Sequence, residues 1–161
     1  MNDLPLHPSL VHFPIALAVL VPILGALLLL GTRRDDATAH RAFRLPTLAQ
    51  AAALLFGLAA QRTGDGDHHE VEKFVDRAII HAHEEAGELF LITAGVTLVL
   101  WFAAAAAARV DLGRKVAVAA VVVGIVGGGL ALRAGHKGGE LVYRYGAAGA
   151  YTQDTAEPTP P

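Results

Sequence analysis

The sequence predicts an all-α integral membrane four-helix bundle, with a short amphipathic outer helix between the second and third spans. Hydrophobic residues make up 53% of the 161 residues and charged residues only 17%, whereas soluble domains hold about 45–50% and about 25%. The apolar residues gather in four runs without a fixed charge. The length allows one domain, so we expect a single domain over 1–150 and a disordered tail over 151–161.

Each apolar run accounts for one expected span. The runs are Leu10–Leu30, Leu45–Ala60, Leu89–Ala108 and Val116–Leu132. A helix needs about 20 residues to cross a bilayer core of about 30 Å. The first and third runs meet this length alone, and flanking residues complete the other two. The expected spans are therefore about 10–30, 45–62, 84–108 and 115–133.

Two other interpretations of the first run are less consistent with the sequence. A cleavable signal peptide needs a positive segment before its apolar run, whereas the first basic residue is Arg33, after the run. A soluble bundle would need a polar face on every helix, and Leu17–Leu30 has none. Membrane insertion is the better prediction.

The charges of the connections predict the orientation. The two connections on one side carry a net charge of +4, which leaves −6 on the other side of a chain with net charge −2. The basic residues of the positive side are Arg33, Arg34, Arg41, Arg44, Arg109, Arg114 and Lys115. By the positive-inside rule, both termini and the long acidic connection lie outside the cytoplasm.

The long outer connection is expected to form a loop followed by a helix. Thr63–Asp67 has the glycine and aspartate content of a turn. The following apolar residues have the spacing of an amphipathic helix, which we expect to lie over the outer membrane face. They are Val71, Phe74, Val75, Ala78 and Ile79. In the fourth span, Gly124 and Gly128 form a small-xxx-small pair that favours close helix packing.

Residue usage narrows the chemistry of any site. The chain has no cysteine, and Met1 is its only methionine. This excludes disulfides, cysteine-ligated zinc, iron–sulfur clusters, covalently attached haem and blue copper. The slightly negative net charge does not favour nucleic-acid binding. Histidine and carboxylate remain as metal ligands, and seven of the eight histidines fall on the predicted outer side, with only His40 inside.

The outer ends of three spans carry the strongest candidates. In an antiparallel bundle, His12, His83 and His136 reach a similar height, and imidazoles from facing helices can hold haem or metals. We expect two of them to bind haem b and the third to support them. Basic residues near the fourth span are candidate partners for haem propionates. They are Arg133, Lys137 and Arg144.

Two alternatives remain open. One is a site for zinc, iron or copper, because imidazole with carboxylate suits these metals. Its candidate ligands are His7, His12, His83, His136, Glu84 and Glu88. The other is a cofactor-free membrane subunit or scaffold, in which the histidines are interfacial hydrogen-bonding groups. Hydrolase and transporter functions are disfavoured, because Ser9 is the only serine and the four apolar runs contain no fixed charge.

Three segments resemble a known family. LHPSLVHFPIAL near the N-terminus, HEEAGELF in the middle and GHKGGELVYRYG near the end resemble, in order and spacing, the DUF2231 family of small bacterial four-helix membrane proteins. The resemblance extends to about Ala150. It implies that His7, His12, His83 and His136 are the recurrent histidines, whereas His68, His69 and His81 are particular to this chain.

The resemblance also implies a role near electron transfer, because similar proteins are fused to c-type cytochrome or Rieske modules. The leading prediction is therefore a b-type haem protein of the bacterial inner membrane, with both termini on the non-cytoplasmic side. Bis-histidine ligation favours electron transfer over oxygen activation, so whether the protein is an enzyme stays open. Expected partners are membrane lipid and a periplasmic c-type cytochrome or other redox protein; homo-oligomerisation is left open.

Overall fold

A computed structural model of the chain describes residues 5–31 and 39–152, and every regular element in these ranges is a helix. The prediction of an all-α protein is confirmed for this part of the chain. The elements, in order, are α1 (His7–Leu10), α2 (His12–Gly31), α3 (Ala39–Ala42), α4 (Arg44–Val71), α5 (Arg77–Ala106), α6 (Asp111–Tyr143) and α7 (Gly149–Thr152).

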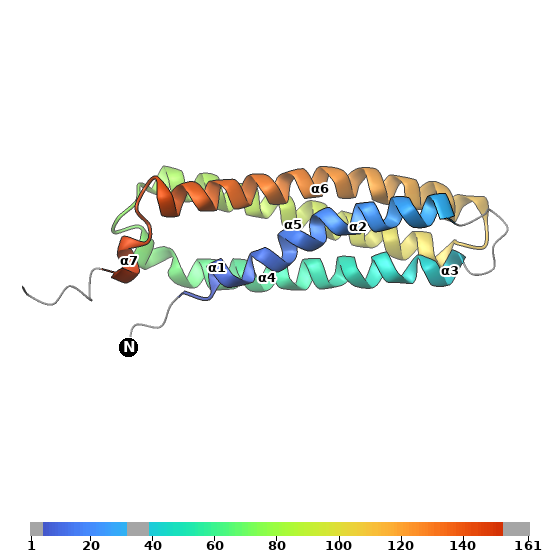
Figure 1. Cartoon of the computed structure of the whole chain (residues 1–161), viewed down its shortest axis with the longest axis horizontal. Helices are drawn as coiled ribbons and strands as arrows, with labels where there is room; N and C mark the ends of the chain where they lie inside the picture. Colours follow the sequence, from blue (N-terminus) through green and yellow to red (C-terminus); the bar gives the residue numbers. More distant parts are fainter. Residues whose placement is uncertain (1–4, 32–38, 153–161) are drawn as a thin grey trace, which may run out of the picture.

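The four long helices lie side by side, with α3 at one end of the molecule and α7 at the other (Figure 1). Helix α2 packs against α4 and α6, and α5 packs against the same two helices. Each long helix therefore has two long neighbours, as short connections between successive antiparallel helices require. The ends of the molecule are called the α3 end and the α7 end below.

Within residues 5–31 and 39–152, three helices are long and apolar enough to cross a membrane. They are the helical segments His7–Gly31, Arg77–Ala106 and Asp111–Tyr143. They correspond to the first, third and fourth predicted spans, although the helix of the third span ends two residues before the predicted 108. The second predicted span, 45–62, lies within α4, which is not among these three candidates. Its residues 61–71 are largely polar.

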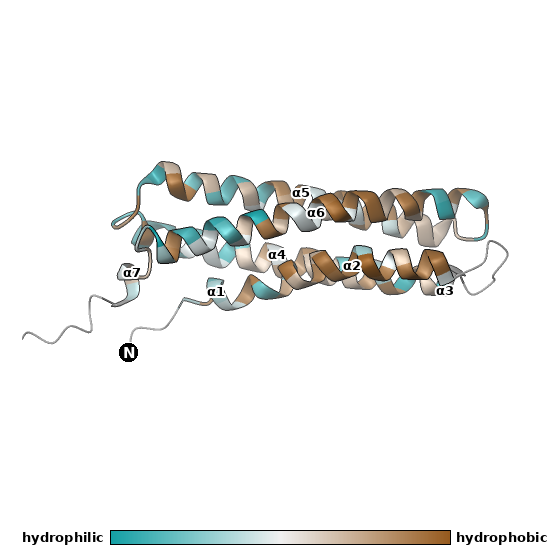
Figure 2. Cartoon of the chain, turned by 45° about the horizontal axis from the view of Figure 1, so that its top comes forward, coloured by the Kyte–Doolittle hydropathy of each residue, from teal (hydrophilic) through white to brown (hydrophobic). Residues whose placement is uncertain are grey.

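The helices continue well beyond the predicted spans at the α7 end. Helix α4 runs to Val71 instead of ending near 62, α5 starts at Arg77 instead of 84, and α6 runs to Tyr143 instead of ending near 133. Ten helical residues add about 15 Å. Figure 2 shows that these extensions are mainly hydrophilic, whereas the middle of the molecule is mainly hydrophobic. The bundle thus ends in a polar helical extension.

The predicted turn at Thr63–Asp67 and the separate amphipathic helix after it are wrong. Helix α4 passes through this segment, and the Thr63 hydroxyl donates to the Ala59 and Ala60 carbonyls at 3.2 and 2.9 Å. The chain turns later, between Val71 and Arg77, where the Asp76 side chain accepts a hydrogen bond from the Ala78 amide at 2.8 Å and caps α5.

The spacing that predicted the amphipathic helix reflects packing inside the molecule. Val75 and Ile80 are buried with Leu141 and Ala147, and Val71 and Ile79 pack against them. We call these residues the outer cluster. Val71 and Val75 therefore pack with the ends of α5 and α6, whereas Phe74 and Ala78, predicted for the same face, are exposed.

Two prolines shape the first span. Pro14 has no amide hydrogen to donate to the Leu10 carbonyl, and the helix is interrupted at Val11, between α1 and α2. Pro22 likewise leaves the Ala18 carbonyl without its helical donor, and α6 packs against that carbonyl. A methyl group on Gly128 would lie 3.1 Å from the Ala18 oxygen. The absence of a side chain at Gly128 permits this close approach.

The predicted small-xxx-small pair is confirmed as a packing feature. Gly124 and Gly128 are both buried on α6, and a methyl group on Gly124 would lie 3.4 Å from the Pro22 Cβ atom. Both glycines therefore face α2. Three polar side chains of the spans, Gln50, Thr93 and Thr97, donate to backbone carbonyls, and Gln50 of α4 reaches the Ala94 carbonyl of α5 at 3.0 Å.

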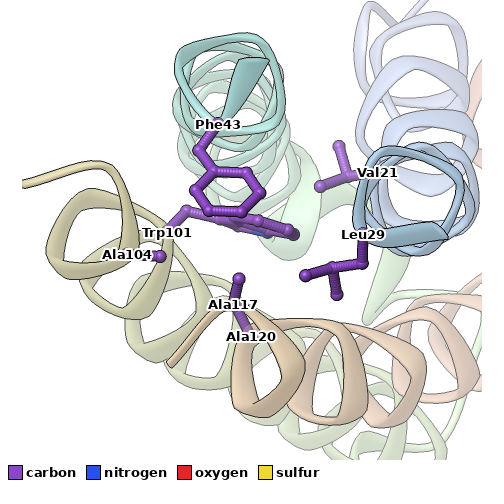
Figure 3. Close-up of a cluster of buried hydrophobic side chains, with 7 residues drawn as sticks. All are labelled: Val21, Leu29, Phe43, Trp101, Ala104, Ala117 and Ala120. Atoms are coloured by element: carbon purple, nitrogen blue, oxygen red, sulfur yellow. The ribbon is translucent and has the colours of Figure 1, made fainter. Parts of the chain in front are cut away.

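The core consists of separate layers along the bundle. Trp101 lies at the centre of a cluster toward the α3 end, with Phe43, Val21 and Leu29 around it (Figure 3). A methyl group on Gly25 would come within 2.4 Å of the Trp101 ring. A central cluster contains Ala18, Phe90, Ala94 and Ala131. The outer cluster closes the α7 end.

Part of the expected tail is ordered, because Tyr151 belongs to the helical turn α7. The rest of that tail, residues 153–161, lies outside the described residues, as does the side chain of His40 in α3.

Candidate histidine site at the polar end of the bundle

His7 docks onto α4 at a glycine. Its Nδ1 atom lies 2.7 Å from the Ala60 carbonyl oxygen. A methyl group on Gly64, one turn further along α4, would come within 3.0 Å of the same ring. Because a carbonyl oxygen can only accept, Nδ1 must carry the proton and donate it. Of the two neutral tautomers, the hydrogen bond therefore favours the one whose Nε2 atom carries no proton.

His83 docks onto α6 in the same way. Its Nδ1 atom donates to the Ala134 carbonyl at 3.1 Å. A methyl group on Gly138 would lie 3.2 Å from the ring. In both cases the histidine packs over a glycine and donates to the carbonyl four residues before that glycine. His83 is half-buried, and its tautomer is fixed by the same argument.

The two docked histidines meet each other. The ring centroids of His7 and His83 are 6.0 Å apart, and the ring planes are at 85°. His7 belongs to α1, which packs on α4, whereas His83 belongs to α5, which packs on α6. The pair, called the histidine pair below, thus connects the two halves of the bundle. It lies between the central and outer clusters, because its docking glycines fall between the residues that α4 and α6 contribute to them.

The structure does not bring together the three histidines expected to converge. His12 and His136 are exposed on the outside of the bundle. Of the three, His83 is the one whose ring contacts another histidine. The partner of His83 is His7, which was expected only in the bare-metal alternative. The reason is helix rotation: five residues advance a helix by about 500°, so His7 and His12 point in directions about 140° apart.

Glu84 belongs to a second group of side chains, between α4 and α5. Its two carboxylate oxygens lie 2.5 Å from His68 Nδ1 and 3.1 Å from His81 Nδ1. His68 also lies 3.7 Å from Glu72 of the turn. Glu88, the other expected carboxylate ligand, is exposed. Within residues 5–31 and 39–152, no three histidine or acidic side chains are placed to hold a metal ion together.

Glu72 is the most connected carboxylate of this second group. Arg77 donates to it at 3.0 Å, and His69 lies 3.2 Å away. Burial raises the pKa of Glu72, but the hydrogen bond and charge of Arg77, aided by His69 and His68, outweigh this effect and hold the pKa below its ordinary value. These contacts tie the end of α4 to the start of α5.

The three basic residues expected near a cofactor differ in their surroundings. Lys137 is half-buried and lies close enough to His83 to interact with it electrostatically. Arg133 is exposed. Arg144 lies 3.4 Å from the Glu140 carboxylate, and its guanidinium stands 5.6 Å from the centre of the Tyr145 ring. Lys137 is therefore the one that accompanies the histidine pair.

A sequence pattern other than hydropathy and motif spacing could have predicted the histidine pair. Ala60 and Gly64, and likewise Ala134 and Gly138, are alanine–glycine pairs four residues apart, at the level where the spans become polar. Such a pair offers a flat helix surface and an accessible carbonyl. A histidine on a neighbouring helix at the same level can use both.

These features define an α-helical membrane protein with a histidine pair in the polar extension of its bundle. Residues 3–150 match the family described as predicted membrane protein, DUF2231. The chain belongs to this family, as the resemblance of its three segments predicted. Neither a curated protein nor a solved structure matches the chain.

Proposed function

We propose that the protein is a b-type haem protein of the membrane and that His7 and His83 would hold the haem iron. The observation that supports this most directly is the pair of docked rings on opposite halves of the bundle. Each ring donates Nδ1 to a backbone carbonyl, which is the outer hydrogen bond that metal-binding histidines commonly make. The Nε2 atom of each ring is left as the ligand.

The spacing of the rings is compatible with a shared metal centre. Two imidazoles that hold the same metal atom at about 2.0–2.1 Å can have ring centres about 6 Å apart. The centroids of the histidine pair are 6.0 Å apart. Compared with the expected trio, the proposal retains His83 and replaces His12 and His136 with His7.

The number of ligands favours haem over a bare metal ion. Haem iron receives four nitrogens from the porphyrin and needs two axial ligands from the protein. A bare zinc, iron or copper ion needs three or four protein ligands, and no such group occurs in the described part of the chain. Glu84, the best candidate for a third ligand, already contacts two other histidines.

Haem with two histidine ligands supplies one-electron transfer. The chain's own residues hold the ring orientations through the two carbonyl hydrogen bonds, and Lys137 is suited to pair with a propionate. The histidine pair lies in the polar extension, where a periplasmic c-type cytochrome or another redox protein can approach. Electron exchange across this end of the bundle is the proposed role.

We further propose that α4 crosses the membrane together with the three apolar helices. It packs against both α2 and α5, and residues 45–60 contain no fixed charge. Four crossings place both termini on one side, and the acidic α7 end faces away from the cytoplasm by the positive-inside rule. The location is then the bacterial inner membrane, with the histidine pair on its outer side.

The test is an absorption spectrum with metal analysis on one sample, purified in detergent after expression with sufficient haem. We expect a Soret band and one haem per chain. His7→Ala and His83→Ala should each abolish the low-spin spectrum, whereas the control variants His12→Ala and His136→Ala should retain it, because those side chains lie outside the bundle.

Two outcomes would reject the haem proposal. Stoichiometric metal without porphyrin, lost in His83→Ala, would support the bare-metal alternative. Neither haem nor metal, with unchanged assembly in all four variants, would leave a cofactor-free membrane subunit as the better description.

A further inference from the structure

A cavity of about 300 Å³ opens on the bundle surface at the α3 end, far from the histidine pair. It lies between the first turns of α4 and the last turns of α5. Its lining residues are Arg44, Thr47, Leu48, Phe102, Ala105 and Ala106. We call it the α4–α5 groove.

The walls of the groove are apolar and accessible. The side chains of Leu48 and Phe102 are both 69% exposed, and the alanines of α5 form a shallow floor between them. Both walls fall within predicted spans, so acyl chains are the surroundings that they meet. Burying this apolar surface against another apolar group is favourable in proportion to its area.

The rim of the groove carries one cation. Arg44 is exposed and is the first residue of α4, immediately before the apolar run that starts at Leu45. The Thr47 hydroxyl donates to the Phe43 carbonyl at 2.7 Å, so Arg44 is the lining side chain that offers hydrogen-bond donors to an external anion. Arg41 and Arg109, also exposed, add positive charge at the same end.

The order of these features matches one class of molecule. Along α4, a guanidinium at Arg44 is followed one turn deeper by an exposed leucine, about 6 Å further into the membrane. A phospholipid presents a phosphate and then an acyl chain in the same order. We propose that the α4–α5 groove binds an anionic phospholipid, with its phosphate on Arg44 and an acyl chain between Leu48 and Phe102.

The preference for an anionic headgroup follows from charge. A zwitterionic phosphatidylcholine brings a quaternary ammonium toward an arginine-rich surface, whereas phosphatidylglycerol brings none. Basic pockets at the membrane surface bind anionic lipid headgroups by this difference.

Native mass spectrometry on the full chain tests the proposal. The protein is released from nanodiscs that contain equal amounts of phosphatidylglycerol and phosphatidylcholine. We expect one phosphatidylglycerol to be retained in preference to phosphatidylcholine. Arg44→Gln should lower its retention about fivefold, the effect of one basic residue near an anionic membrane surface.

Two further variants separate charge from shape. Arg62→Gln removes an exposed arginine from the same helix, far along α4 from the groove, and should leave retention unchanged. Ala106→Leu keeps the charge but fills the floor, and should reduce retention of both lipids. Circular dichroism of each variant confirms that it is folded.

Equal retention of the two lipids by the unmodified chain would overturn the proposal. Equal losses in Arg44→Gln and Arg62→Gln would also overturn it, because the effect would then come from total charge and not from the groove. Neither result depends on whether the histidine pair binds haem.

Discussion

Replacing Gly64 with alanine tests whether this glycine is present to receive the His7 ring. A Cβ atom at this position would lie 3.0 Å from His7 Nδ1, so the ring must give by a few tenths of an ångström, and we expect its hydrogen bond to the Ala60 carbonyl to weaken. Such a bond contributes about 1 kcal/mol net. Alanine, in turn, favours a helix over glycine by about 1 kcal/mol, so the two effects should roughly cancel.

Gly66 is the matched control on the same helix. Nothing lies within 4 Å of a Cβ atom built at Gly66, so Gly66→Ala should give the helix-propensity gain without the loss. The two variants should therefore differ by about 1 kcal/mol. For a domain of this size, that corresponds to a difference of about 2–4 °C in thermal unfolding midpoint, measured by circular dichroism in one detergent.

A double-mutant cycle isolates the contact. Once His7→Ala removes the ring, Gly64→Ala should stabilise the protein as much as Gly66→Ala does, which gives a coupling of about 1 kcal/mol between His7 and Gly64. If Gly64→Ala raises the midpoint equally with and without the His7 ring, the docking argument for the histidine pair is wrong.

Three further predictions concern the core, an interhelical bond and the turn. Gly25→Ala should lower the free energy of unfolding by about 1–3 kcal/mol, because its methyl group would come within 2.4 Å of the Trp101 indole ring. Gly95→Ala is the control in the same thermal unfolding assay, because nothing lies within 4 Å of a Cβ atom built at Gly95. Gln50→Leu should cost about 0.6 kcal/mol by the same assay, the average for an interhelical hydrogen bond in a membrane, and an unchanged midpoint would contradict it. Burial raises the pKa of Glu72, but Arg77 lowers it by more, so the folded pKa lies below the ordinary carboxyl value of 4.5. The stabilisation that this carboxylate gives the fold is therefore present above pH 4.5 and is lost as the pH falls through the lower folded pKa. The unfolding midpoints of Glu72→Gln should consequently vary less with pH in that window than those of the unmodified chain.

Hydropathy was sufficient to predict the positions of the helices and insufficient to predict their ends. Apart from one or two residues at the ends of the first and third runs, the apolar runs lie inside α2, α4, α5 and α6, because a run without fixed charges must be buried in lipid or protein. The helices end elsewhere, since a polar segment such as 61–71 can remain helical in water. Gly64 and Gly66 looked like a turn for this reason, although α4 passes through both.

The charges of the connections distinguished the two ends of the bundle. The acidic segment predicted to lie outside is the polar extension that contains the histidine pair, so charge and candidate site fall at the same end. Val71, Val75 and Ile79 meet in the outer cluster, but they come from α4, the turn and α5 and not from one helix, and Phe74 and Ala78 of the predicted apolar face are exposed. Hydropathy could not distinguish the two arrangements, because a membrane surface and the ends of neighbouring helices favour the same apolar residues.

The choice of histidines depended on rotation, which neither hydropathy nor charge determines. His83 and Glu84 are neighbours in sequence but about 100° apart around α5. His83 consequently faces α6 and His7, whereas Glu84 faces His68 on α4. The positions of small residues determine which histidine docks. A histidine at the polar end of a span needs an accessible carbonyl on a neighbouring helix, and a glycine one turn after that carbonyl leaves room for the ring. Depth along the bundle together with the positions of such glycines selects His7 over His12, and this criterion applies to any bundle whose spans continue into a polar helical extension.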